Sequence, residues 1–126
     1  MLGSQYDITM QQGSTFELYL TVKDASGNIK NLTDYSAAMQ IRTAYSATTP
    51  TESLSSDSGE ITIAPSSGKI NISLSAARTA AIKVDLTSNK KPPRSLYVYD
   101  LELTDNDSKV SKLLYGDITV YGEVTR

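Results

Sequence analysis

The stretch YVYDLELT, residues 97–104, decides the fold class of this chain. Tyrosine or leucine occupies every odd position, and Asp100 and Glu102 occupy two of the even positions between them. Successive side chains of a β-strand point to opposite faces of the sheet. The pattern therefore predicts a strand with a buried tyrosine-leucine face and a second face that carries two carboxylates.

The same alternation recurs on both sides of this stretch, in runs short enough to be strands. We expect strands at 6–10, 16–22, 37–45, 61–64, 69–75, 96–104 and 110–121, the last interrupted at Gly116, with a short addition at 29–32. The segments DASGN (24–28) and DNDSK (105–109) have the composition of turns, and PSSG (65–68) that of a hairpin connection.

Three segments depart from this pattern. Residues 46–60 are rich in hydroxyl side chains and have no periodicity, which predicts a long loop. Residues 87–95 contain two adjacent prolines, which are incompatible with a central strand, so we expect a loop there as well. The alanine-rich run at 75–84 predicts the one short helix, with Ser75 as its N-cap.

About seven to nine short strands at hairpin spacing predict an all-β protein. A sheet with one apolar face must cover that face, and a second sheet does so most simply. We therefore expect one domain over residues 1–126, an antiparallel β-sandwich that is immunoglobulin-like or related. The pattern leaves the order of the strands open.

Composition argues against several classes of partner. The 126 residues carry a net charge of −2, so neither nucleic acid nor an anionic membrane surface is an expected partner. No apolar run approaches the length of about 20 residues that a membrane-spanning helix needs. The first residues lack the basic and apolar regions of a signal peptide, so we expect synthesis in the cytoplasm without export by this route.

The sequence offers few residues suited to catalysis or metal binding. Asp100 and Glu102 suit an acid/base pair by type and spacing, but we expect them to form the wet face of a strand or a cross-strand salt bridge. The chain has no histidine and no cysteine, and DNDS (105–108) lacks the spacing of a calcium loop. We therefore expect no catalytic residue, no metal, no cofactor and no small-molecule substrate.

Protein contact is the more plausible use of the remaining polar and aromatic residues. The chain has eight tyrosines and no tryptophan, and tyrosine is enriched at interfaces. The segment NKKPPRS (89–95) adds three cations on a loop. The candidate contact residues are Tyr6, Tyr45, Lys90, Lys91, Arg94, Tyr121, Glu123 and Arg126.

Four stretches together resemble a class of small β-sandwich structural proteins of tailed bacteriophages, encoded among tail, baseplate or neck genes. The stretches are YDITMQQGSTF (6–16), LTDYSAAMQIR (32–42), YVYDLELT (97–104) and LLYGDITVYGEVTR (113–126). The matching positions are Tyr6, Asp7, Ile8, Gln12, Gly13, Leu32, Thr33, Tyr35, Met39, Ile41, Arg42, Tyr99, Asp100, Leu101, Leu103, Gly116, Val120, Val124, Thr125 and Arg126. The resemblance skips residues 46–60 and 87–95.

The resemblance implies a non-enzymatic virion protein present in many copies, which binds itself and other phage virion proteins. Within this class, a head decoration protein on the capsid is the alternative to a tail, baseplate or neck protein. A carbohydrate- or receptor-binding module is an alternative from a different class. Strand edges and the terminal segments 1–6 and 122–126 are the expected contacts, because such segments can add to the sheet of a neighbour.

Overall fold

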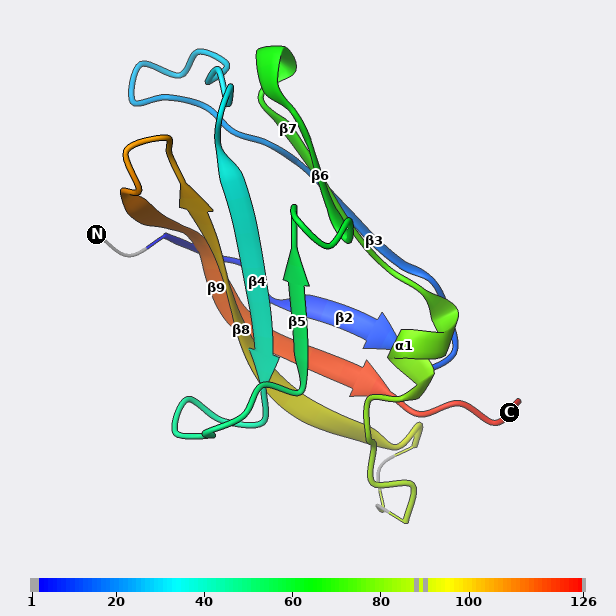
Figure 1. The fold of residues 1–126 in the computed structure, drawn as a ribbon. Coiled ribbons are helices and arrows are strands. Elements are labelled where there is room, and N and C mark those ends of the chain that lie inside the picture. The colour runs from blue at the N-terminus through cyan, green and yellow to red at the C-terminus, as the bar shows by residue number, and fades with distance from the viewer. Residues whose placement is uncertain (1–2, 88, 90, 126) are drawn as a thin grey trace.

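The computed structural model describes residues 3–87, 89 and 91–125, which form nine strands, one short α-helix and one 3-10 turn (Figure 1). The strands are β1 (Ser4–Gln5), β2 (Ile8–Gln11), β3 (Phe16–Thr21), β4 (Ser36–Arg42), β5 (Glu52–Ser55), β6 (Ile61–Ala64), β7 (Lys69–Leu74), β8 (Arg94–Thr104) and β9 (Val110–Tyr121). The helix α1 covers Ala76–Ala80, and the 3-10 turn η1 covers Pro65–Ser67.

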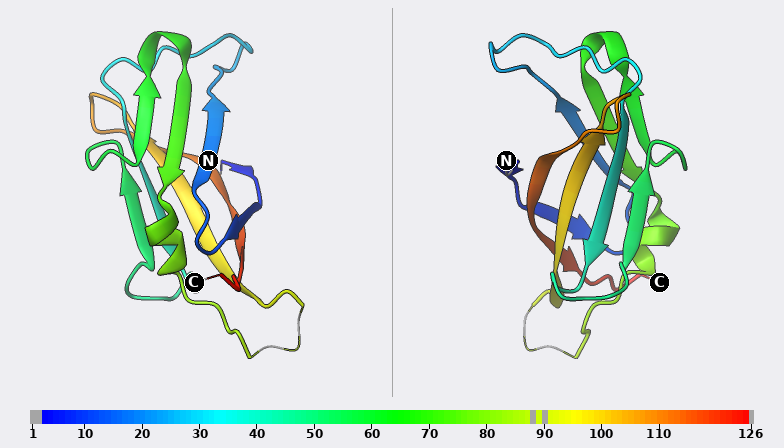
Figure 2. Two further views of the ribbon diagram at one scale, coloured as in Figure 1. Left: turned by 90° about the vertical axis from the view of Figure 1, so that its right-hand side faces the viewer. Right: turned by 60° about the vertical axis from the view of Figure 1, so that its left-hand side comes forward.

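The strands form two sheets that pack face to face, which confirms the predicted β-sandwich (Figure 2). One sheet has the order β1-β9-β8-β4-β5, with β2 also paired to β9, and the other has the order β3-β7-β6. Both sheets contribute side chains to one apolar core. Its most buried members include Met39, Ile41, Leu101, Ile118 and Val120 from the larger sheet, and Ile61, Ile70, Ile72 and Leu74 from the smaller.

Strand β8 lies at the centre of the larger sheet and follows the predicted pattern. It begins at Arg94, directly after Pro93, and pairs antiparallel with β4 and with β9. Its tyrosines and leucines at 97, 99, 101 and 103 are buried, while Asp100 and Glu102 lie on the outer face. The stretch 97–104 is thus the strand that the alternation predicted.

The N-terminal strands differ from the antiparallel expectation, because β1 and β2 both run parallel to β9. Parallel neighbours need a long connection, and here most of the chain separates β2 from β9. Strand β2 leads into β3 of the opposite sheet, so no hairpin sets its direction. Local alternation predicts a strand at 6–10 but carries no information about its pairing with β9.

Residues 46–60 are not one continuous loop, because β5 lies within them and pairs with β4. Leu54 is buried at 2% exposure and packs into the core. Leu54 is the only large apolar residue of a hydroxyl-rich run. Strand β5 therefore shows no alternation of apolar and polar residues from which a strand could be predicted. Conversely, Ile29 makes an isolated bridge with Lys23 and starts no strand.

Strand β9 is continuous through Gly116, where we expected an interruption. The glycine has a packing role, because a Cβ at this position would lie 2.5 Å from the carbonyl oxygen of Tyr6. The strand instead contains a bulge opposite the Leu101/Glu102 step of β8. This bulge determines which β9 side chains face the carboxylates.

Helix α1 begins where predicted and ends earlier than residue 84. The Ser75 hydroxyl accepts a hydrogen bond from the backbone N–H of Arg78, as an N-cap should. Arg78 then forms ion pairs of 2.6 Å with Glu52 and with Glu60. Glu52 belongs to the edge strand β5 and Glu60 immediately precedes the edge strand β6, so one arginine links the two sheets.

Candidate functional site

The two carboxylates of β8 share a single cation. Lys112 of β9 lies opposite Glu102 in the register and binds Glu102 at 2.9 Å and Asp100 at a shorter distance. Hydrogen bonds to Asp100 and Glu102 raise the pKa of Lys112. All three side chains are between 34% and 40% exposed. This is the cross-strand salt bridge that the sequence predicted as one possibility. Both carboxylates pair with the same lysine.

Tyr45 lies on the loop between β4 and β5 and lines a hollow together with Asp100 and Lys112 of this salt bridge. It is 75% exposed and lies between two shallow hollows of about 280 and 180 Å³. Both hollows are lined by Tyr45 and Asp100, and Arg42 lines the larger one. The arrangement suits contact with a polar surface, since an exposed aromatic ring lies beside paired charges.

A second group of candidate residues gathers where β9 ends. The Arg94 guanidinium stacks over the Tyr121 ring, 5.8 Å from its centroid. Leu96 follows on the same face of β8 and is 61% exposed. Gln11 and Pro92 line a hollow of about 420 Å³ together with Tyr121. We call these five residues the Tyr121 patch.

The segment after β9 is bound into the fold. The Gly122 N–H donates to the carbonyl of Pro93 at 2.8 Å, and the Glu123 N–H donates to Gln12 Oε1 at 3.4 Å. Gln12 Nε2 in turn donates to the carbonyl of Ile82 at 2.6 Å. The backbone of Glu123 therefore holds the chain end to the loop between β2 and β3. Glu123 is half-exposed and has a structural role in this contact.

The remaining candidates fall into three situations. Tyr6 is 48% exposed, while its backbone N–H donates to the carbonyl of Tyr115 at 2.9 Å. Lys91 is exposed on the loop before β8. Lys90 and Arg126 lie outside the described residues.

The segment 105–108 is a turn stabilised by its own aspartate. Asp105 Oδ1 accepts hydrogen bonds from the backbone N–H groups of Asp107 at 2.9 Å and Lys109 at 3.0 Å. Across residues 3–87, 89 and 91–125, no group of three or more acidic side chains is placed to hold a metal ion. Within the same residues, no helix has the length and apolarity to cross a membrane.

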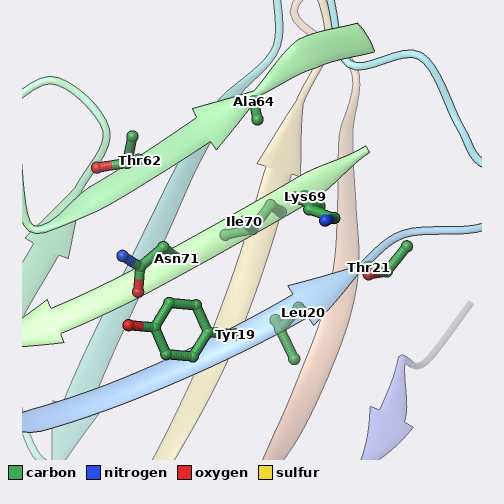
Figure 3. A pocket seen from close by; sticks show the side chains of 8 residues that line it. All are labelled: Tyr19, Leu20, Thr21, Thr62, Ala64, Lys69, Ile70 and Asn71. Atoms are coloured by element: carbon green, nitrogen blue, oxygen red, sulfur yellow. The ribbon is translucent and has the colours of Figure 1, made fainter. Parts of the chain in front are cut away.

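The outer face of the smaller sheet carries a hollow of about 400 Å³ that the sequence pattern does not indicate (Figure 3). Its lining includes Tyr19 from β3, Thr62 from β6, and Lys69 and Asn71 from β7. These residues are the polar positions of three alternating strands, which normally indicate no more than a solvated face. Only the pairing of the strands brings them together.

Comparison with known proteins adds little to this geometry. No protein-family model matches the chain, and no curated protein matches it. Among solved structures, it is similar to the extracellular domains of the voltage-gated sodium channel beta4 subunit, described as parallel homodimers that explain a role in cell-cell adhesion. The identity is 16% and the TM-score 0.43, over 98% of this chain and 97% of that chain. A likeness at this level says nothing of what the present chain binds.

Proposed function

We propose that this chain is a non-enzymatic structural protein of a tailed-phage virion that assembles with copies of itself and with tail, baseplate or neck proteins. The sequence resemblance at both ends of the chain suggests the class. The observation that best supports a role in assembly is the Tyr121 patch. It places the exposed Leu96 beside the stacked Arg94 and Tyr121, on the paired strands β8 and β9.

The chemistry of the Tyr121 patch is that of a protein contact. Tyrosine and arginine are enriched at interfaces and among the residues that contribute most of the binding energy. Leu96 lies between Arg94 and Val98 on the outer face of β8, and its backbone is fixed by pairing with Thr119 of β9. A second copy related by a two-fold axis would bring the two Leu96 side chains together.

Self-association is tested by sedimentation velocity over a concentration series. We expect the wild-type chain to form an oligomer that Leu96→Glu dissociates, because the charge would be buried in the contact. Val110→Glu is the matched control, since Val110 is 58% exposed at the opposite end of β9. A wild-type chain that stays monomeric, or equal effects of the two substitutions, contradicts assembly through this patch.

The virion location is tested by immunogold electron microscopy of phage particles from the bacterium that carries the gene. We expect label on the tail, the baseplate or the neck. Label over the capsid surface would instead favour the head decoration alternative. Particles without label, in a preparation where the free protein is detected, would contradict a virion role of either kind.

A further inference from the structure

The outer face of the smaller sheet combines an exposed aromatic ring, an amide and hydroxyl groups around one hollow. We propose that this hollow is a carbohydrate-binding site that holds one saccharide unit of an oligosaccharide. The proposal concerns a different sheet from the Tyr121 patch and does not rest on the assembly proposed above.

The strand register places the ligating groups in two adjacent rows. Tyr19 of β3 and Thr62 of β6 lie on either side of Asn71 of the central strand β7. In the next row, Lys69 lies between Thr21 and Ala64. All six residues line the hollow, and its volume of about 400 Å³ falls within the usual range for small-molecule sites (Figure 3).

Tyr19 supplies the apolar wall of the site. Its side chain is 68% exposed, and its hydroxyl donates a hydrogen bond to Glu17, which orients the ring. One face of a pyranose consists largely of C–H groups, which pack favourably on an aromatic ring. The same sugar carries hydroxyl groups that must keep hydrogen bonds when they leave water. A site for a sugar therefore needs an aromatic wall and polar groups side by side, as this hollow has.

Asn71 supplies the central polar group. Its Oδ1 is buried and accepts no hydrogen bond from any described residue. Buried polar atoms are nearly always hydrogen-bonded, so this acceptor requires an explanation. Asn71 lines the hollow, and the last torsion of an asparagine side chain is soft, so rotation of the amide would let it accept from and donate to vicinal hydroxyls of a bound sugar.

Residues 64 and 69 shape the rim. Ala64 has a short side chain and leaves the hollow open on the β6 side (Figure 3). Lys69 is exposed and forms no ion pair with any described residue, so its ammonium is available to hydroxyl or carboxylate oxygens. A saccharide with an acidic group would satisfy this cation as well.

The direct test is an NMR titration of the ¹⁵N-labelled chain with glucose, N-acetylglucosamine and glucuronic acid in turn, followed by a printed oligosaccharide array. We expect at least one sugar to shift the amide signals of Tyr19, Thr21, Thr62 and Asn71, including the side-chain amide of Asn71. A folded chain that shows no such shift and binds nothing on the array overturns the proposal.

Three variants locate the binding. Tyr19→Ala and Asn71→Ala should each weaken the titrated affinity about tenfold, the size of one lost aromatic contact or hydrogen bond. Tyr45→Ala is the matched control, because Tyr45 is similarly exposed, at 75% against 68% for Tyr19, but lies on the loop between β4 and β5 and does not line this hollow. Equal loss in the Tyr45 variant overturns the proposed site. Loss of self-association in Tyr19→Ala, without any sugar shift in the wild type, would make this face a protein contact instead.

Discussion

The carbonyl oxygen of Tyr6 lies 2.5 Å from the point where a Cβ on Gly116 would stand. The Tyr99 hydroxyl donates a hydrogen bond of 2.5 Å to the same oxygen. The N-terminal segment therefore runs past β9 at a residue without a side chain, and a hydrogen bond from the buried Tyr99 holds it there. This close approach lies between the two stretches in which β1 and β2 pair with β9.

Gly116→Ala should destabilise the fold by about 1–3 kcal/mol, because the new methyl group must displace the backbone of Tyr6 or of β9. Urea denaturation measures the loss, and Ser111→Ala, an exposed change on the same strand, should stay within about 0.5 kcal/mol of wild type. A Gly116→Ala variant as stable as wild type would mean that the N-terminal segment does not lie on β9.

Tyr99→Phe should cost about 1 kcal/mol, since it removes the hydrogen bond to the Tyr6 carbonyl and keeps the buried ring. Combined with Gly116→Ala, its effect should be smaller than alone, because the alanine has already displaced the acceptor. A double-mutant cycle by urea denaturation measures this coupling. Strictly additive effects would show that the two residues do not act on the same carbonyl.

Lys112 links the two carboxylates, and replacing both carboxylates should change the pKa of Lys112 more than the stability of the fold. Asp100→Asn combined with Glu102→Gln should lower the pKa of Lys112, because the hydrogen bonds and charges that raise it are removed. NMR titration of the lysine side chain measures the shift. The three side chains are partly exposed, so the free energy of unfolding should change by less than about 1 kcal/mol. A larger loss would contradict a surface salt bridge.

Strand β8 was predictable because fully buried and less buried positions alternate from Leu96 to Thr104. Strand β5 was not, since Leu54 is its single apolar anchor. The parallel pairing of β2 with β9 was equally out of reach, because it depends on residues far apart in the chain. Alternation thus reports which face of a strand is buried and not which strand lies beside it.

The candidate residues show the same limit. The charges of Asp100 and Glu102 were visible, but their partner was not, because the bulge in β9 determines that Lys112 faces Glu102. Gln12 was noted only as part of a resemblance, and the structure gives it a role in holding Glu123. The hollow beside Tyr19 needs three strands in register before its residues become neighbours.

The carboxyl group of Glu60 should make stability depend on pH. Hydrogen bonds from the Ser58 hydroxyl, the Ser55 N–H and Arg78 lower the pKa of Glu60 from 4.5 to about 2. A carboxyl group with a lower pKa in the folded state stabilises the fold above its unfolded pKa. This stabilisation is therefore present above pH 4.5 and is lost as the pH falls toward 2.

Glu60→Gln should accordingly be less stable than wild type at neutral pH, by about 1–2 kcal/mol after allowance for solvent screening. The difference should shrink below pH 4.5 and approach zero near pH 2. Urea denaturation at a series of pH values measures it. Asp57→Asn, an exposed change in the same loop, should follow the wild-type curve. A Glu60→Gln deficit that does not vary with pH would contradict the lowered pKa.

Two truncations separate the structural and the contact roles of the chain end. Removal of residues 122–126 takes away the hydrogen bonds of Gly122 and Glu123, so it should lower the free energy of unfolding by about 1–3 kcal/mol. Removal of 124–126 starts at Val124, which is 94% exposed, and should leave the melting temperature unchanged. Thermal denaturation measures both effects.

If the exposed end contributes to assembly, the shorter truncation weakens self-association in sedimentation velocity while the fold stays intact. An unchanged oligomer would remove this end from the contact and leave the Tyr121 patch to account for assembly.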